Sequence, residues 1–144
     1  MKFNQVGIVA CDTDALAEFY IRVFGCKDLR PRIHISGDEV SRPLGIESSE
    51  TYVAWLSLPG VGGVVLEIFS FKECKETPLS CADWRGNTTL AFDVEDLEAV
   101  AEAVVSAGGS YVGEITRVND GDFKFIYVFM RDLEGNMLDL KQWD

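Results

Sequence analysis

Four polar side chains interrupt apolar, strand-like segments and carry groups suited to chemistry: Gln5, Glu67, Thr89 and Asp139. Together they offer two carboxylates, one amide and one hydroxyl, so oxygen is the only donor element. Oxygen donors suit magnesium, manganese or calcium better than zinc. Without a metal, two close carboxylates raise one another's proton affinity and could act as general acid and base. The set predicts a cation site or a polar pocket, provided that the fold brings its members together.

The positions of these residues along their segments place all four on one side of the strands. Side chains alternate across a sheet, so neighbours in sequence point to opposite faces. The residues of the other parity are uniformly apolar: Val6, Ile8, Leu66, Ile68, Leu90, Phe92, Leu138 and Leu140. We expect the apolar set to pack under helices and the polar four to enter a cavity on the opposite face.

The first half of the chain predicts a strand, a helix and then two more strands. Residues 3–10 alternate and are rich in β-branched side chains. Residues 12–25 begin with Asp and Thr, end in Gly and carry apolar side chains at helical spacing. Strands are expected at 51–60 and 63–71, whereas the polar stretch 30–49 has no clear pattern.

The second half repeats this order. Residues 87–94 predict a strand, and 95–109 predict a helix that ends in two glycines. Strands are expected at 110–118, 122–132 and 137–143. Such duplicated units bury their helix-facing sides and can curve around a shared cavity.

We therefore predict an α+β fold of two β-α-β-β-β units that form a curved mixed sheet around one cleft, with the helices outside. The units are expected at residues 1–71 and 86–144, and the segment 72–85, which contains Pro78, is the expected linker.

Charge and hydropathy exclude several partners. The net charge is −11, and phosphate contacts need clustered Lys and Arg, so nucleic-acid binding is not expected. No apolar run approaches the roughly 20 residues that cross a bilayer, so no membrane partner is expected. The N-terminus lacks the features of a signal peptide, which predicts a cytoplasmic protein.

The cysteine and histidine counts restrict the chemistry further. The cysteines, Cys11, Cys26, Cys74 and Cys81, form no C-x-x-C motif, and we expect reduced, mostly buried thiols. His34 is the single histidine, so one chain cannot build an iron site from two histidines and a carboxylate. The G-x-S-x-G motif of serine hydrolases is also missing.

Four segments in chain order resemble the vicinal oxygen chelate superfamily, which includes glyoxalase, bleomycin-resistance proteins and extradiol dioxygenases: QVGIVACDTDALAEFYIRVFG, LEIF, TTLAFDVEDLEAV and MRDLEGNMLDL. The first contains the F-Y-x-x-x-x-G pattern, and the last resembles the ending D-P-x-G-N-x-x-E-L. The resemblance implies paired β-α-β-β-β units. It also implies metal ligands, in the family's enzymes, at the positions of Gln5, Glu67, Thr89 and Asp139.

The sequence departs from the family's metal enzymes at three positions. Thr89 replaces the usual His, and a neutral hydroxyl is a poor ligand for zinc or nickel. Asp139 is one methylene shorter than Glu, and Leu133 replaces the Pro of the ending. The resemblance leaves open a divalent metal, magnesium, manganese, nickel or zinc, that would polarise a substrate carbonyl. It leaves open a metal-free binding pocket as well.

Aromatic residues near the polar set offer walls for such a pocket: Trp55, Phe69, Tyr127 and Phe129. An aromatic face attracts a cation by about 0.5–2 kcal/mol. These side chains could equally belong to the core. Separately, Arg30, Arg32 and Arg42 flank His34 and could hold an anionic substrate tail or belong to a solvated loop.

These observations predict a small-molecule-binding protein of the glyoxalase/bleomycin-resistance type whose cleft takes a cationic or aromatic ligand. The alternative is a divalent-metal-dependent lyase, isomerase or epimerase acting on a carbonyl or thioester substrate, with Glu67 and Asp139 as catalytic carboxylates. The resemblance also implies a homodimer, because family members often complete their sites by pairing.

Overall fold

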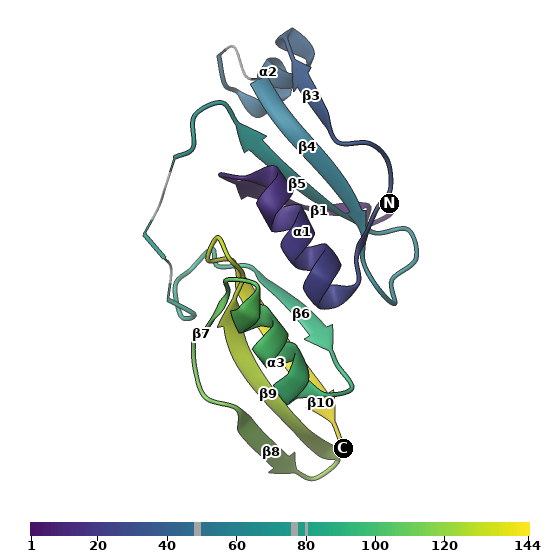
Figure 1. Ribbon diagram of the computed structural model, residues 1–144, viewed down its shortest axis with the longest axis vertical. Coiled ribbons are helices and arrows are strands. Elements are labelled where there is room, and N and C mark those ends of the chain that lie inside the picture. The colour runs from purple at the N-terminus through teal and green to yellow at the C-terminus, as the bar shows by residue number, and fades with distance from the viewer. Residues whose placement is uncertain (48–49, 76–77, 80) are drawn as a thin grey trace. The chain divides into compact units, whose positions relative to one another are not determined.

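The computed structural model describes residues 1–47, 50–75, 78–79 and 81–144. These residues form an α+β fold with two mixed five-stranded sheets and three helices. The chain divides into two compact units, Met1–Thr77 (unit 1) and Pro78–Asp144 (unit 2). Each unit contains one sheet and resembles the predicted β-α-β-β-β order, with one more strand in each unit and a second short helix in unit 1 (Figure 1). The predicted fold class is therefore confirmed.

Unit 1 contains these elements: β1 (Gln5–Ala10), α1 (Thr13–Phe24), β2 (Lys27–Asp28), β3 (Ile33–Ser36), α2 (Asp38–Leu44), β4 (Glu50–Ser57) and β5 (Val65–Phe71). The strand order is β1-β5-β4-β2, and β3 also pairs with β4. Strands β1 and β5 are parallel, whereas β4 and β5 are antiparallel. The stretch 30–49, which had no clear pattern, supplies β3 and α2.

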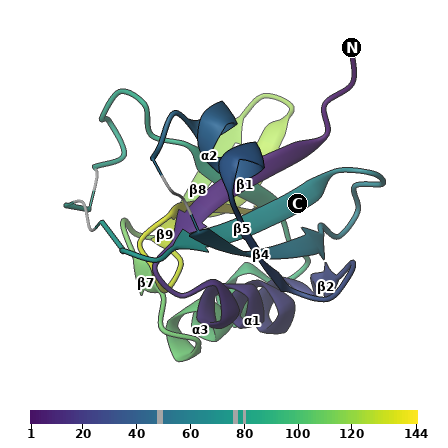
Figure 2. The same ribbon diagram turned by 90° about the horizontal axis from the view of Figure 1, so that it is seen from above.

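Helix α1 forms where capping residues bracket an apolar stripe. The Asp12 side chain accepts a hydrogen bond from the Ala15 backbone N–H, and Gly25 ends the helix at φ 69°. Thr13 Oγ1 lies 2.9 Å from Ser70 Oγ, and Tyr52 donates to Asp14. These contacts place α1 on the face of the sheet formed by the even-numbered residues of β4 and β5 (Figure 2).

Unit 2 contains β6 (Thr89–Asp93), α3 (Leu97–Ser106), β7 (Ser110–Tyr111), β8 (Thr116–Asp120), β9 (Phe123–Arg131) and β10 (Met137–Trp143). The strand order is β6-β10-β9-β7, and β8 also pairs with β9. Asp96 caps α3 through the Ala99 N–H, and the Leu97 N–H donates to the Gln142 side chain. The Gln142 contact places α3 on the face of the even-numbered residues of β10.

The predicted core is present in each unit. Five of the predicted residues are at most 9% exposed: Ile8, Leu66, Ile68, Leu138 and Leu140. Val6, Leu90 and Phe92 are half-buried, as expected for strands β1 and β6, which lie at the edges of their sheets. The alternation of apolar and polar residues therefore determines which face each helix covers.

One predicted strand is divided in two. The segment 110–118 forms β7 and the start of β8, with a bulge between them. The chain from Tyr111 to Thr116 is longer than the facing segment of β9 between their pairing partners, Met130 and Tyr127. The backbone N–H groups of Val112 and Gly113 both donate to the Phe129 carbonyl, which accommodates the extra residues.

The turn between β9 and β10 is built around the buried side chain of Asp132, which is 3% exposed. Its carboxylate accepts hydrogen bonds from the backbone N–H groups of Glu134 and Asn136 and from the Asn136 side chain. Gly135 adopts φ 92°, a conformation that favours glycine. This turn fixes the register of β10 and therefore the direction in which Asp139 points.

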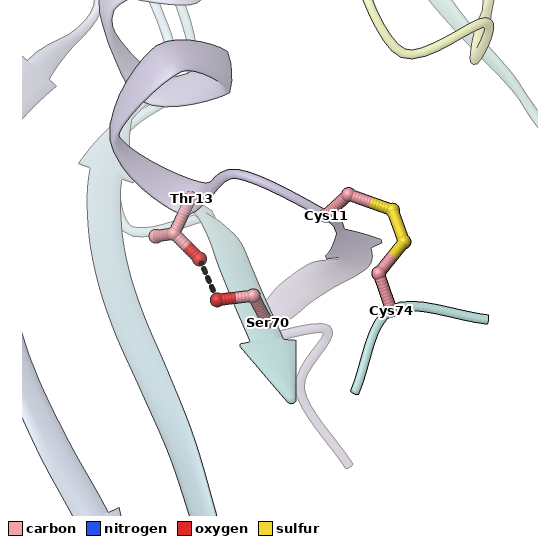
Figure 3. Close-up of a disulfide and its surroundings, with 4 residues drawn as sticks. All are labelled: Cys11, Thr13, Ser70 and Cys74. Atoms are coloured by element: carbon pink, nitrogen blue, oxygen red, sulfur yellow. Dashed lines mark hydrogen bonds between the residues drawn. A yellow bond between two sulfur atoms is a disulfide. The ribbon is translucent and has the colours of Figure 1, made fainter. Parts of the chain in front are cut away.

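The prediction of four reduced thiols is wrong for two of them. Cys11, directly after β1, forms a disulfide with Cys74, which follows β5 (Figure 3). The two strands are parallel partners, so their ends bring the cysteines within 5.1 Å between Cα atoms. Cys26 is a buried free thiol, and Cys81 is an exposed one.

Membrane-spanning helices are missing from the described ranges, since none of their helices is both long and apolar enough.

Candidate functional site

In unit 1, the site face is the side of the sheet opposite α1, and it carries Gln5, Trp55, Glu67 and Phe69. Glu67 pairs with Trp55 across β4 and β5, and Gln5 lies on the neighbouring strand β1. The Gln5 Nε2 atom donates to Glu67 Oε2 at 2.5 Å, and Trp55 Nε1 donates to Glu67 Oε1 at 2.7 Å. Two neutral donors therefore hold the Glu67 carboxylate, one on each oxygen.

The face of the Trp55 ring is covered by an arginine. The Arg30 guanidinium carbon lies 3.5 Å from the ring centroid, which is close cation–π stacking. The backbone helps to place it, because the Leu29 N–H donates to the Trp55 carbonyl at 2.8 Å. Trp55 is only 7% exposed as a result.

Gly7 leaves room for two of the predicted site residues. A Cβ atom at this position would lie 3.4 Å from the Phe69 ring and 4.0 Å from Glu67 Oε2. Phe69 in turn contacts Phe71 edge to face, with centroids 5.7 Å apart. Because Gly7 has no side chain, β1 leaves open space on the site face between Gln5 and Val9.

In unit 2, the site face lies opposite α3 and carries Thr89, Tyr127, Phe129 and Asp139. Asp139 pairs with Phe129 on β9 and with Ala91 on β6. Its Oδ1 atom is buried and has no hydrogen-bond partner among the described residues. Its Oδ2 atom lies 3.7 Å from the Lys141 ammonium group. Asp139 therefore has one oxygen beside a cation and one that lacks a donor.

A row of aromatic rings lies beside Asp139 along β9. Phe125, Tyr127 and Phe129 contact one another edge to face, with centroids 5.7 and 6.1 Å apart. Trp143 on β10 extends the row, 4.9 Å from Phe125, and its indole N–H donates to Asp93. We call these four rings the aromatic row.

Thr89 lies at the start of β6, opposite Met137, and its side chain is exposed. It shares the site face with Asp139 but lies two residues before Ala91, the residue on β6 that pairs with Asp139. Within the described residues, no hydrogen bond or ion pair joins its hydroxyl to Asp139.

His34 belongs to the opposite face of unit 1. It pairs with Tyr52 across β3 and β4, and the two rings lie 4.5 Å apart. The Tyr52 hydroxyl donates to Asp14 in α1, which places both rings on the helix side of the sheet. His34 therefore cannot join Glu67 on the site face.

Arg32 also has a structural role. Its side chain is 14% exposed, and its guanidinium contacts Asp14, Glu18 and Asp28 at 2.8 to 3.0 Å. The hydrogen bond to Asp28, followed by those to Asp14 and Glu18, raises the pKa of Arg32 above its usual value. These three ion pairs connect the segment after β2 to α1.

The oxygen donors fit poorly around a zinc or nickel ion. Each unit supplies one carboxylate and one neutral oxygen, and the Lys141 ammonium occupies the surroundings of Asp139 Oδ2. In the part of the chain that the structure describes, no three His, Cys, Asp or Glu side chains gather as they would around a metal. The buried Oδ1 atom of Asp139 has no donor among the described residues.

The site faces include residues that the sequence prediction missed: Gly7, Phe125, Lys141 and Trp143. Lys141 and Trp143 share the parity of Asp139 on the same strand, and Phe125 shares that of Tyr127. Alternation could therefore have placed them. Their contacts depend on how β9 and β10 pair, which alternation does not reveal.

Comparison with known proteins identifies the family. Residues 2–140 match the model of the Glyoxalase/Bleomycin resistance protein/Dioxygenase superfamily. A glyoxalase family protein from Bacillus cereus is similar in structure, with a TM-score of 0.83 at 21% identity, over 99% of this chain and 93% of that one. A glyoxalase I variant from Zea mays has a TM-score of 0.68 at 20% identity, over 99% of this chain and 46% of that one.

A superfamily protein from Frankia sp. is also similar, with a TM-score of 0.66 at 20% identity, over 100% of this chain and 98% of that one. Among curated proteins, none matches the chain. The paired β-α-β-β-β units and the family match over nearly the whole length agree. The chain therefore belongs to the Glyoxalase/Bleomycin resistance protein/Dioxygenase superfamily.

Proposed function

We propose that this protein binds a small aromatic molecule on the site face of unit 2, without a catalytic metal. The observation that carries the proposal is the buried Oδ1 atom of Asp139, which lacks a donor among the described residues and lies beside the aromatic row. A buried acceptor without a donor is costly, by about 1–3 kcal/mol. A ligand that brings an N–H or O–H group to this oxygen and packs its flat body on the rings removes that cost.

The contacts of the protein's own cationic side chains favour an aromatic ligand over a cationic ligand. Arg30 already covers Trp55, and the Lys141 ammonium lies 5.2 Å from the Phe125 ring and 5.9 Å from the Trp143 ring. A ligand cation would have to displace these groups or accept repulsion from them. A neutral or anionic aromatic molecule meets neither cost.

A calorimetric titration with 2-naphthol, which has a flat body and one O–H donor, tests this proposal. Asp139→Asn should weaken binding by about tenfold to a hundredfold, because a hydrogen bond to a charged group contributes about 1.5–3 kcal/mol. The exposed Asp122→Asn variant removes the same charge from the turn between β8 and β9 and should bind normally. If 2-naphthol does not bind, or if both variants bind like the wild type, the proposal is wrong.

The predicted alternative, a divalent-metal-dependent lyase, isomerase or epimerase with Glu67 and Asp139 as catalytic carboxylates, is tested with the wild type and the Asp139→Ala variant. Titration with magnesium, manganese, nickel and zinc should show no stoichiometric binding. Tight binding of one metal that Asp139→Ala abolishes would favour the alternative.

Three further predictions belong to this proposal. The homodimer and the shared cleft stay predictions, and sedimentation of the purified chain would measure the first. The cytoplasmic location also stays a prediction. The Cys11–Cys74 disulfide weighs against it, because disulfides are rare in the cytosol.

A further inference from the structure

Arg30 and Arg32 lie two residues apart in the sequence but differ in the number of carboxylates that contact them. Three carboxylates surround Arg32. No ion pair joins Arg30 to any residue that the structure describes. The chain has 24 acidic residues against 13 basic ones, so carboxylates are plentiful. The positive charge of Arg30 therefore has no carboxylate partner among the described residues.

The Trp55 ring holds this unpaired guanidinium in place. The guanidinium carbon lies 3.5 Å from the ring centroid, so the group rests on the ring, and its N–H groups lie along the edges of this planar group. Trp55 is itself fixed by its hydrogen bond to Glu67, which Gln5 holds in turn. Four side chains from β1, β4, β5 and the segment after β2 thus form one connected group.

We propose that Arg30 is an anion-recognising residue of unit 1, and that the ligand carries a carboxylate or a similar flat oxyanion. A guanidinium stacked on an indole loses little further conformational freedom on binding, and its planar edge matches the two oxygens of a carboxylate. The inference rests on the proposed function only in taking the ligand to be a small aromatic molecule.

Glu67 restricts the position at which an anion can bind in this subsite. One N–H of the Gln5 amide and the indole N–H of Trp55 already donate to the two Glu67 oxygens. The Glu67 carboxylate repels an incoming oxyanion, whereas the Arg30 guanidinium attracts it. The arrangement positions one end of the ligand relative to the sheet.

The test compares 6-hydroxy-2-naphthoate with 6-hydroxy-2-naphthamide by calorimetry, because both keep the flat body and the O–H donor and they differ in charge. The wild type should bind the carboxylate at least tenfold more tightly than the amide, since charge-assisted hydrogen bonds are the stronger kind. Arg30→Gln should abolish that preference. Arg30→Lys should restore it only in part, because lysine keeps the charge but not the planar edge.

Arg42→Gln is the matched control, because Arg42 is 80% exposed and pairs only with Asp38 among the described side chains. It should keep the preference. Binding of both compounds with equal affinity, or a preference that survives Arg30→Gln, overturns the inference and leaves the proposed function standing.

Failure of both compounds to bind would count against the proposed function instead. Titration with acetate alone then decides the role of Arg30 through thermal stabilisation. Acetate that stabilises the wild type and Arg42→Gln but not Arg30→Gln supports the anion subsite, and equal responses of all three proteins overturn it.

Discussion

Removal of the Cys11–Cys74 disulfide should lower the stability of unit 1 substantially. The bridge joins cysteines that are 63 residues apart, and the loop that it closes lies wholly inside unit 1. In the chain-entropy account, a loop of this length contributes about 4 kcal/mol by restricting the unfolded chain. Small domains have net stabilities of about 5–15 kcal/mol, so this contribution is a large share of the total.

The assay is urea unfolding of the double variant Cys11→Ser/Cys74→Ser, monitored by circular dichroism. With a slope of about 2 kcal/mol per molar urea, the transition of unit 1 should move down by about 2 M. The double variant avoids a single unpaired thiol at either position. Cys81→Ser, which removes an exposed free thiol of unit 2, is the control and should unfold like the wild type.

Two results would refute the reasoning. Four free thiols in the denatured, unreduced wild type would show that the bridge does not form. Equal urea midpoints for a verified disulfide-containing wild type and the double variant would show that closing the loop adds no stability.

Three other changes have expected outcomes. Cys26 should resist a thiol reagent at pH 8 while Cys81 reacts, because burial raises the pKa of the Cys26 thiol to about 11. The folded protein therefore favours the neutral Cys26 thiol. This contribution to stability is fully present below pH 9 and is lost as the pH rises toward 11. Rapid labelling of both thiols in the native protein would contradict this. Asp132→Ala should cost about 3 kcal/mol in urea unfolding, because a buried carboxylate that accepts three hydrogen bonds is lost, and an unchanged midpoint would argue against its role in the turn. Gly109→Ala should destabilise unit 2 by more than about 1 kcal/mol, since the added Cβ would lie in conflict with the Arg131 carbonyl; a melting temperature equal to that of the wild type would refute this.

The sequence determined the architecture because alternation is a local property. The parity of Leu66 and Ile68 against Glu67, and of Leu138 and Leu140 against Asp139, is enough to separate a core face from a site face. The capping residues Asp12 and Asp96 similarly mark where the helices begin, without information from distant segments.

Alternation and capping residues did not predict the short elements between α1 and β4. Strand β2 has two residues and β3 has four, so neither is long enough to show a period. The bulge after Tyr111 depends on the length of the facing strand β9, which a local pattern does not contain.

Only the tertiary structure decided what each site residue touches. Arg30 reaches Trp55 because the segment after β2 runs beside β4. Cys11 and Cys74 meet because β1 and β5 are parallel and end together. Alternation along a strand gives the face on which a residue lies, whereas its partner is set by pairing between strands that are distant in sequence.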